Sequence, residues 1–355
     1  MKILIVRLSS IGDAVQGIPC LVALKESFPD WKISWLVEET SAPILKNHPY
    51  LEHLFILRRD WRKKKEGVSP LDVVEGTSNM WKVWRALRRE HFDAAIDFQG
   101  LFKSGFWSWL SGAPRRIGHN KTREFAHYFL NEFASDRPTF DPSFPLVERY
   151  LEPARLLGAD LTKAHYILPP SDTETTLQVN SLFNSVKVHT KNNGPFVALC
   201  PWSAWPSKNW PLERWKELAR CLLKDFHVLI IGTSSNEAAA HEICLDAPDI
   251  INFAGKTNLA MLTEIFKRCK AVIGPDSGPV HLANATGIPH ILMLFGPTSW
   301  KRSGPFGHGH RTLSTNLECQ PCFKRICPLG HLNCQKQLSL SDVLEAAQEL
   351  AKSKR

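Results

Sequence analysis

Long hydrophobic runs are missing from this sequence of 355 residues. The first apolar stretch, Ile3–Val6, stops at Arg7, which is too short for the apolar core of a signal peptide. No later run approaches the ~20 apolar residues that a membrane-spanning helix needs. We therefore expect neither a secreted nor an integral membrane protein, and the cytoplasm is the compartment that fits.

Repeats and common nucleic-acid-binding signatures are also absent. The sequence has no internal repeat of fixed period, no low-complexity tract, and neither an RRM nor a helix-turn-helix signature. Its composition is ordinary for a globular protein, with 43% hydrophobic and 22% charged residues. Its length allows two domains, each with its own core.

Nine cysteines would be unusual as disulfides in a reducing compartment. Five lie scattered in apolar contexts and are expected in the core: Cys20, Cys200, Cys221, Cys244 and Cys269. The others form the cluster Cys319-x2-Cys322-x4-Cys327-x6-Cys334, with His331 between. Four thiolates this close can hold Zn²⁺ or an iron–sulfur centre. The spacing does not fit a zinc ribbon, so a structural metal and reduced, unliganded thiols both stay open.

The formal charge of +9 is concentrated in one stretch. Between Phe55 and Arg123 there are 15 Lys and Arg against 7 Asp and Glu, an excess of 8 positive charges. Aromatic residues are interleaved with these charges: Trp61, Trp81, Trp84, Phe92, Phe102, Phe106, Trp107 and Trp109. Such a surface favours an anionic partner, whether nucleic acid, an acidic membrane face or a phosphorylated glycolipid, unless the tryptophans turn into the core.

Short apolar runs alternate with segments of helical periodicity, which predicts an α/β protein. The expected strands are residues 2–8, 32–38, 54–57, 93–97, 196–200, 227–231, 271–273 and 289–295. The expected helices are residues 18–28, 80–89, 212–223, 259–269, 280–286 and 339–351, with one more around Glu237. We predict a domain over residues 1–168, a connector over 169–194 with one polar helix, a second domain over 195–338, and a C-terminal helix over 339–355.

Residues 271–295 read as strand, loop, helix and strand, a βαβ unit whose ligands bind beyond the carboxyl ends of its strands. The loop Gly274–Pro279 opens the helix, so backbone N–H groups and the helix dipole would suit a phosphate there. Gly278 lets the main chain approach a ligand closely, and Ser277 and His281 add donors. The alternative is a tight turn with a core-facing histidine.

Four motifs stand in order along the chain: Arg7–Asp13 (RLSSIGD), Asp97–Ser104 (DFQGLFKS), Trp205–Trp210 (WPSKNW) and Gly274–Leu282 (GPDSGPVHL). Together they make the chain from Lys2 to about Phe306 resemble the bacterial lipopolysaccharide heptosyltransferases, the ADP-heptose-using glycosyltransferases of family 9. The resemblance implies a GT-B fold, with an N-terminal acceptor domain and a C-terminal nucleotide-sugar domain, both Rossmann-like, facing each other across a cleft. It implies transfer of heptose from ADP-L-glycero-D-manno-heptose to the lipopolysaccharide inner core (Kdo–lipid A or heptosyl-Kdo–lipid A), with inversion and without an obligatory metal.

The resemblance also implies roles for individual residues. Asp13 matches the family's proposed catalytic base, and a carboxylate after Gly12 at the carboxyl end of a strand can take the proton of an attacking hydroxyl. Asp is also common as a helix N-cap, which is the structural alternative. Lys208 matches the lysine near the donor diphosphate, where a fixed cation would stabilise the ADP leaving group.

Further positions match binding residues of the family. Besides Lys208, the expected donor contacts are Ser203, Glu237, Thr257, Asp276, Ser277, Gly278 and His281. The expected acceptor contacts are Ser10, Gly12, Arg58, Arg59, Gln99, Lys103 and Arg123. Because a carboxylate does not favour a phosphate, Asp276 is expected either to bind ribose or sugar hydroxyls or to brace its loop. The resemblance does not cover the cysteine cluster well, so we expect catalysis not to need it.

Two other interpretations remain. One is a GT-B transferase that uses a UDP-, GDP- or CMP-sugar, because the adenine pocket cannot be read from the sequence. The other is a basic nucleic-acid-binding protein with a cysteine-rich metal loop, which would leave two α/β domains unexplained; we expect no nucleic acid as partner. The expected partners are ADP-heptose, the anionic lipopolysaccharide core and the cytoplasmic face of the inner membrane, where the protein would be peripheral.

Overall fold

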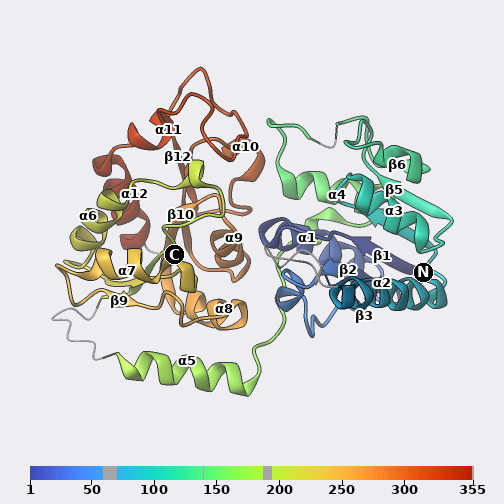
Figure 1. The fold of residues 1–355 in the computed structure, drawn as a ribbon, viewed down its shortest axis with the longest axis horizontal. Helices are drawn as coiled ribbons and strands as arrows, with labels where there is room; N and C mark the ends of the chain where they lie inside the picture. The colour runs from blue at the N-terminus through green and yellow to red at the C-terminus, as the bar shows by residue number, and fades with distance from the viewer. Residues whose placement is uncertain (59–69, 139, 187–193, 354–355) are drawn as a thin grey trace. The chain divides into compact units, whose positions relative to one another are not determined.

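The computed structural model describes residues 1–58, 70–138, 140–186 and 194–353, and the chain forms two compact units (Figure 1). The first unit consists of Met1–Asp141 with Leu146–Pro170, and the second of Pro142–Pro145 with Ser171–Arg355. Each unit is built around a six-stranded sheet, which confirms the predicted α/β class. No helix of the described segments is both long enough and apolar enough to cross a membrane.

The first unit contains a parallel sheet in the order β3-β2-β1-β4-β5-β6. Its strands are β1 (Lys2–Val6), β2 (Lys32–Glu38), β3 (His53–Leu57), β4 (Ala94–Asp97), β5 (Arg115–Gly118) and β6 (Glu132–Phe133). Its helices are α1 (Ile11–Ser27), α2 (Pro70–Glu90), α3 (Phe102–Leu110) and α4 (Leu146–Leu156), with the 3₁₀ turns η1 (Ala42–Ile44), η3 (Ala126–Phe129) and η4 (Leu161–Lys163).

Both faces of the central strand β1 are covered. Its residues from Ile3 to Val6 have no exposed surface, and a continuous apolar run of this kind is typical of a parallel strand buried on both sides. Helix α1 packs so closely that a Cβ at Gly17 would lie 2.9 Å from Trp35 Cη2 on β2. This packing fixes the position of α1, whose first turn carries Asp13.

Helix α1 begins seven residues before the position predicted from the sequence. The small residues before Ile18 suggested a loop, but the Ser10 N–H donates to Asp13 Oδ2 (3.0 Å) and the helix opens at Ile11. This reciprocal capping pattern satisfies backbone donors that the first turn leaves unpaired. Pro19, expected near the helix start, therefore lies inside the helix.

The second unit contains a parallel sheet in the order β12-β11-β10-β7-β8-β9. Its strands are β7 (Phe196–Leu199), β8 (His227–Ile230), β9 (Ile251–Asn252), β10 (Cys269–Pro275), β11 (His290–Phe295) and β12 (Arg311–Ser314). Its helices are α5 (Thr173–Ser185), α6 (Leu212–Leu222), α7 (Glu237–Cys244), α8 (Leu259–Lys267), α9 (Gly278–Ala285), α10 (Trp300–Ser303), α11 (Asn333–Lys336) and α12 (Leu340–Lys352), with the 3₁₀ turns η5 (Pro206–Lys208) and η6 (Ser234–Asn236).

Other predicted helix boundaries also differ from the structure. Helix α2 extends from Pro70 to Glu90, whereas periodicity indicated a start at Met80. The helix expected to reach Cys269 ends at Lys267, because Cys269 already pairs with β7 as the first residue of β10. Pairing between distant strands decides this second boundary, so the local pattern could not show it.

Helices α5 and α12 both pack within the second unit. In α5, which lies in the predicted connector, Phe183 meets Phe253 edge-on with ring centroids 5.3 Å apart. In α12, Val343 is fully buried in the same apolar cluster as Trp215 of α6. Ser339 caps α12, since its Oγ accepts a hydrogen bond from the backbone N–H three residues on (3.1 Å).

Both sheets have the same topology. In each, the chain enters at a central strand, adds strands on one side, and then crosses to the other side. The reversal lies between β1 and β4 in the first sheet and between β7 and β10 in the second. In open parallel sheets, ligands bind beyond the carboxyl ends of the strands at such switch points. The loops after these four strands are therefore the expected location of functional residues.

Candidate active site

A buried ion pair occupies the switch point of the second unit. Lys208 follows β7 on η5, and Asp276 follows β10. Lys208 Nζ lies 2.8 Å from Asp276 Oδ2 and donates to the Asp276 carbonyl oxygen at 3.0 Å. The ammonium also lies 4.8 Å from the centre of the Trp205 ring. The lysine that the sequence predicted is thus held by three contacts: the Asp276 carboxylate, the Asp276 carbonyl oxygen and the Trp205 ring.

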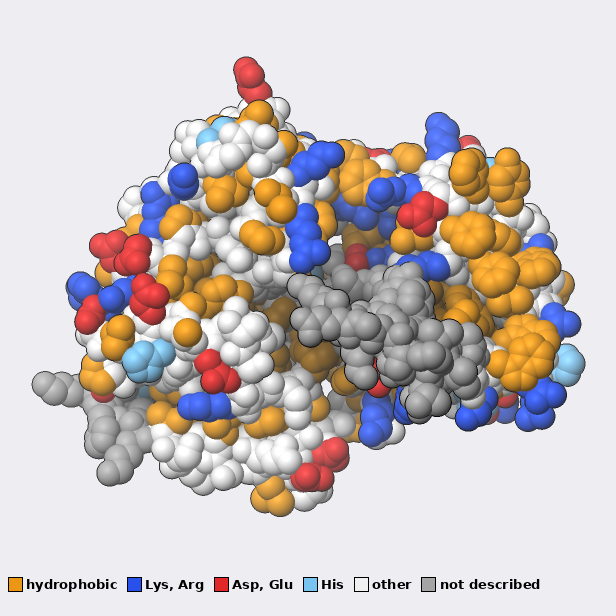
Figure 2. All heavy atoms as spheres, viewed as in Figure 1, with side chains coloured by type: hydrophobic (Ala, Val, Ile, Leu, Met, Phe, Trp, Pro, Cys, Tyr) orange, Lys and Arg blue, Asp and Glu red, His pale blue; other side chains and the backbone are white. Residues whose placement is uncertain are grey.

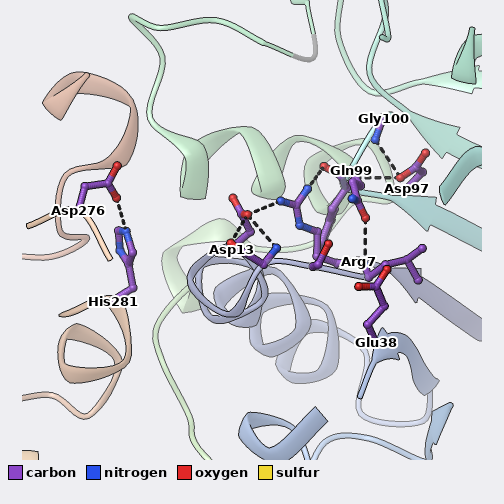
Figure 3. A network of polar contacts seen from close by, with 12 residues as sticks. Arg7, Asp13, Glu38, Asp97, Gln99, Gly100, Asp276 and His281 are labelled. Carbon is purple, nitrogen blue, oxygen red and sulfur yellow. Dashed lines mark hydrogen bonds and ion pairs between the residues drawn. The ribbon is translucent and has the colours of Figure 1, made fainter. Parts of the chain in front are cut away.

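Asp276 also holds His281. Its Oδ1 lies 2.9 Å from His281 Nε2 (Figure 3). Since Lys208 contacts Oδ2, both carboxylate oxygens have partners. Burial opposes the charged form, but the Lys208 ammonium and the His281 ring together lower the pKa of Asp276 below its ordinary range. Of the two expectations for Asp276, these contacts support the bracing of its loop.

The first residues of α9 are arranged as an anion site would be. Ser277 precedes the helix, and its Oγ is buried without a hydrogen-bond partner among the described residues. Gly278 is the first helical residue, so the N-terminal N–H groups and the helix dipole lie beside this hydroxyl. Gly274, which the structure places in β10, lets two segments approach closely, because a Cβ there would lie 2.8 Å from the Cys200 carbonyl oxygen.

The other predicted donor residues lie in loops at the same edge of the sheet. Ser203, after β7, accepts a hydrogen bond from Trp205 N–H (3.3 Å), which shapes the loop that carries Lys208. Glu237 begins α7 after β8, and its carboxylate packs against Gly255, a residue with φ of +72°. Thr257 follows in that same loop after β9. The ends of β7, β8, β9 and β10 each supply one predicted donor segment.

Ser207 is a site residue that the sequence did not reveal. Its N–H donates to the Arg325 carbonyl (3.3 Å) and its Oγ to the Lys324 carbonyl (2.6 Å). Gln335 Nε2 in turn donates to the Ser207 carbonyl (3.3 Å). The segment that contains the cysteine cluster therefore braces the turn next to Lys208, although we expected this segment to be independent of catalysis.

The substitution Ser207→Ala should weaken ADP binding roughly fivefold, because a lost hydrogen bond of about 1 kcal/mol loosens the turn that holds Lys208. Adenosine binding should change much less, since Lys208 is predicted to contact the diphosphate, which adenosine lacks. Calorimetric titration of both ligands measures the difference. Ser185→Ala is a matched control in the same unit, because Ser185 donates an exposed hydrogen bond to Leu182 O (2.8 Å). Wild-type ADP affinity in Ser207→Ala would show that the turn holds its shape unaided.

The cysteine cluster does not form a ready-made metal centre. Across residues 1–58, 70–138, 140–186 and 194–353, no three His, Cys, Asp or Glu side chains are arranged to hold a metal ion. Burial and the nearby thiols of Cys322, Cys327 and Cys319 raise the pKa of Cys334 to about 11. Backbone N–H groups, first that of Leu332, lower the pKa of the Cys327 thiol. The metal centre stays a prediction.

In the first unit, Asp13 lies at the switch point after β1. Its Oδ2 is 2.6 Å from Arg7 Nη2 and accepts from Ser10 N–H (3.0 Å) and Ser10 Oγ (2.7 Å) (Figure 3). Burial raises the pKa, but Arg7 and then Ser10 lower it, to about 2. The other oxygen, Oδ1, makes no hydrogen bond within the described part of the chain. One oxygen thus serves both the cap and the ion pair, and the second has no such contact among the described residues.

Asp97 organises the loop after β4, on the other side of this switch point. Its Oδ1 accepts from the N–H groups of Gln99 (2.8 Å) and Gly100 (3.1 Å), and Ser104 Oγ donates to its Oδ2 (3.0 Å). Burial raises the pKa of Asp97. Gly100 has φ of +62°, which a glycine adopts without strain. The spacing of the DFQGLFKS motif is therefore that of a self-capped turn.

This turn joins the two loops of the first unit. Gln99 Oε1 accepts from Leu8 N–H (3.1 Å), and Lys103 Nζ lies 3.3 Å from Ser9 Oγ and 3.1 Å from Glu38 Oε1. Lys103, expected to bind acceptor anions, therefore carries a carboxylate partner of its own. The roles of Arg7, Glu38 and Asp97 were not predicted. Glu38 acts through Lys103, which is distant in sequence, whereas the partners of Arg7 and Asp97 lie within the quoted motifs and were overlooked.

The remaining predicted acceptor residues differ in their surroundings. Gly12 is buried in the first turn of α1, where it packs and offers no side chain. Arg58 is exposed directly after β3. Arg123 is exposed in a loop, and its own backbone N–H donates to Gly100 O (3.2 Å). Both cations are thus available to an anion at the carboxyl edge of the sheet. Arg59 lies outside the described residues.

Two Rossmann-like units, each with a polar site at its switch point, have the arrangement of the GT-B fold, which the chain shares with a solved heptosyltransferase structure. The profile of glycosyltransferase family 9 (heptosyltransferase) matches residues 80–333. The chain belongs to glycosyltransferase family 9. This membership confirms the family and the enzyme class indicated by the four motifs.

Individual relatives agree with this assignment. The chain is 27% identical over 343 residues to lipopolysaccharide heptosyltransferase 1 of Pseudomonas aeruginosa, covering 92% of this chain and 87% of that protein. It is 26% identical over 324 residues to lipopolysaccharide heptosyltransferase 2 of Escherichia coli, covering 88% of each. The structure of E. coli ADP-heptose lipopolysaccharide heptosyltransferase II matches with a TM-score of 0.72 and 23% identity, covering 99% of this chain and 98% of that one, which shows a shared fold.

Proposed function

We propose that this protein transfers heptose from ADP-L-glycero-D-manno-heptose to the inner core of lipopolysaccharide, with inversion at the anomeric carbon. Family membership supports the reaction class. The observation that carries the proposal is the pair of switch-point sites, with the carboxylate of Asp13 in the first unit and the braced cation Lys208 in the second. The Asp13 carboxylate would activate the acceptor hydroxyl, and the Lys208 cation would stabilise the negative charge of a diphosphate.

The proposed reaction is a single displacement. The acceptor hydroxyl oxygen attacks the anomeric carbon, and its proton passes to Asp13 Oδ1. The bond between the anomeric carbon and the oxygen of the β-phosphate breaks, and ADP leaves with the electron pair. Lys208, with the buried Ser277 hydroxyl and the N–H groups that open α9, stabilises the charge that develops on the diphosphate. These groups carry out the role that a metal has in other transferases, so the reaction needs no obligatory metal.

The acceptor is an anionic glycolipid. Exposed Arg58 and Arg123 lie at the edge where the acceptor reacts, and they suit its phosphates and carboxylates. The protein would act at the cytoplasmic face of the inner membrane, as a peripheral protein, because its acceptor is embedded there. Neither the glycolipid acceptor nor the peripheral membrane location requires a nucleic acid partner.

The test is a transfer assay with defined substrates. The purified protein is incubated with ADP-heptose and either Kdo–lipid A or heptosyl-Kdo–lipid A, and the lipid product is analysed by mass spectrometry. We expect ADP release and the addition of one heptose to one of these acceptors. UDP-, GDP- and CMP-sugars are the matched donors, and preferential use of any of them would replace the ADP-heptose assignment. Hydrolysis of ADP-heptose without a lipid product would contradict the proposed acceptor.

A further inference from the structure

The first unit exposes a group of large aromatic side chains. Six of them form what we call the aromatic surface: Trp81, Phe102, Trp109, Phe125, Tyr128 and Phe133, each between 41% and 75% exposed. They belong to α2, α3, the start of η3 and β6. Figure 2 shows hydrophobic side chains gathered on the face where Figure 1 draws α2, α3 and β6. Single exposed aromatic residues are common, but a group of this size marks an interaction surface.

Helix α3 exposes aromatic residues although its buried face is partly polar. Its buried face carries Trp107, which packs in the core, together with Ser104 and Ser108, while Phe102 and Trp109 are half exposed. The buried serines are satisfied locally, for example by the hydrogen bond from Ser108 Oγ to Ser104 O (3.0 Å). The outward aromatic face is therefore not explained by packing of the core.

The exposed rings are organised by contacts with one another. Phe106 stacks between Phe102 and Trp109, with centroids 6.0 Å and 5.9 Å away, and Phe129 of η3 meets Phe102 edge-on at 5.1 Å. Gly105 makes this close packing of η3 on α3 feasible, because a Cβ there would lie 3.0 Å from a backbone oxygen of η3. The rings therefore form a preorganised platform on one side of the unit.

Positive charges border this platform. Lys82, Arg85, Arg88 and Arg89 are exposed along α2, as are Lys121 and Arg123 in the loop before η3. The Arg85 guanidinium lies 5.4 Å from the centre of the Trp81 ring. Aromatic rings beside Lys and Arg are the combination found where proteins contact an anionic membrane: rings enter the headgroup region and cations meet lipid phosphates.

We propose that the aromatic surface docks this protein onto an anionic lipid bilayer. The proposal rests on the proposed function, since a glycolipid acceptor requires work at a membrane, and none of the described helices could cross one. The rings supply apolar contact, and the cations bordering them supply attraction to the headgroups. Charge attraction is screened within about 10 Å at 0.1 M salt, so raised salt should weaken the docking, while the inserted rings slow its complete release.

The test is co-sedimentation of the full chain with vesicles of phosphatidylglycerol and phosphatidylethanolamine. The triple variant Trp109→Ser, Phe125→Ser and Tyr128→Ser should bind these vesicles roughly tenfold more weakly or worse, because its inserted apolar area is lost. The double variant Leu177→Ser and Leu245→Ser is the matched control, since these leucines are 62% and 60% exposed in the second unit. It should bind like the wild type, and thermal melting checks that both variants fold.

A deacylated core oligosaccharide separates docking from catalysis. The triple variant should transfer heptose to this water-soluble acceptor at the wild-type rate, yet lose activity on acceptor embedded in vesicles. Failure of the wild type on the soluble acceptor would contradict the proposed function while leaving vesicle binding measurable. Equal vesicle binding by wild type and triple variant would overturn the docking proposal. So would a wild-type dimer that the triple variant converts to a monomer in sedimentation velocity, because the surface would then bind a second copy of the chain.

Discussion

Replacing Asp13 by Asn is expected to lower turnover by ~10²–10⁴, the usual contribution of a general base. The amide keeps the size of the carboxylate and can still accept from the Ser10 N–H, which donates to Asp13 at 3.0 Å. It cannot take a proton from an attacking hydroxyl. ADP binding should stay near normal, because the predicted donor residues belong to the second unit. Steady-state ADP release and calorimetric titration with ADP measure these two quantities separately.

A second capping carboxylate in the same unit provides the control. Asp160 accepts from the Thr162 N–H (3.0 Å) at an exposed turn, so Asp160→Asn makes the same substitution at a comparable cap with no link to the site. We expect its turnover to match the wild type. If Asp13→Asn also turned over normally, Asp13 would be only a helix cap and a partner for Arg7.

The ionisation of Asp13 adds a pH-dependent readout. Its pKa of about 2 lies below the ordinary 3.8, because Arg7 and Ser10 outweigh the opposing effect of burial. The folded state therefore gains stability from this carboxylate above 3.8 and loses the gain as pH falls through 2. Asp13→Asn should cost about 2 kcal/mol of unfolding free energy near neutral pH and progressively less toward acid. Denaturant unfolding at several pH values tests this, and a pH-independent cost would assign the loss to packing.

The sequence predicted the positions of several site residues but not their long-range partners. The motifs placed Asp13, Lys208 and Asp276 correctly at strand ends, because short apolar runs followed by Gly, Ser and Asp are local signals. The Ser207 hydroxyl, in contrast, bonds a carbonyl 117 positions away, and Arg7 reaches Phe98 O across 91 positions. No local pattern encodes such pairs. Strands β6 and β9 were missed for another reason, since each is two residues long and shows no periodicity.

The start of α1 shows a different kind of miss. The signal was present, because Ser10 and Asp13 have the spacing of a capping box. The Ser, Gly and Pro residues around it suggested a loop, and burial of α1 against β2 overrides that weak preference. The same misreading concealed how Asp13 is held, since its cap and its contact with Arg7 share Oδ2.

Replacing Lys208 by Met is expected to lower turnover by ~10²–10³, comparable to the loss of one preorganised group that stabilises developing charge. Methionine keeps most of the apolar stem beside Trp205 but carries no charge. ADP binding should weaken more than adenosine binding, because the lost contact is to phosphate. Calorimetric titration with both ligands provides the comparison, and equal losses would place the lysine away from the diphosphate.

The same substitution also leaves Asp276 without its main cation. Lys208 and Asp276 side chains are 13% and 9% exposed, so Lys208→Met should cost on the order of 3 kcal/mol of stability through an uncompensated buried carboxylate. The double variant Lys208→Met with Asp276→Asn removes that charge, and its amide can still contact His281. It should recover most of the lost stability but none of the lost turnover. Recovery of turnover with stability would mean that Lys208 matters only through folding. Loss of turnover in a restabilised protein would instead assign the lysine a direct role in departure of the diphosphate.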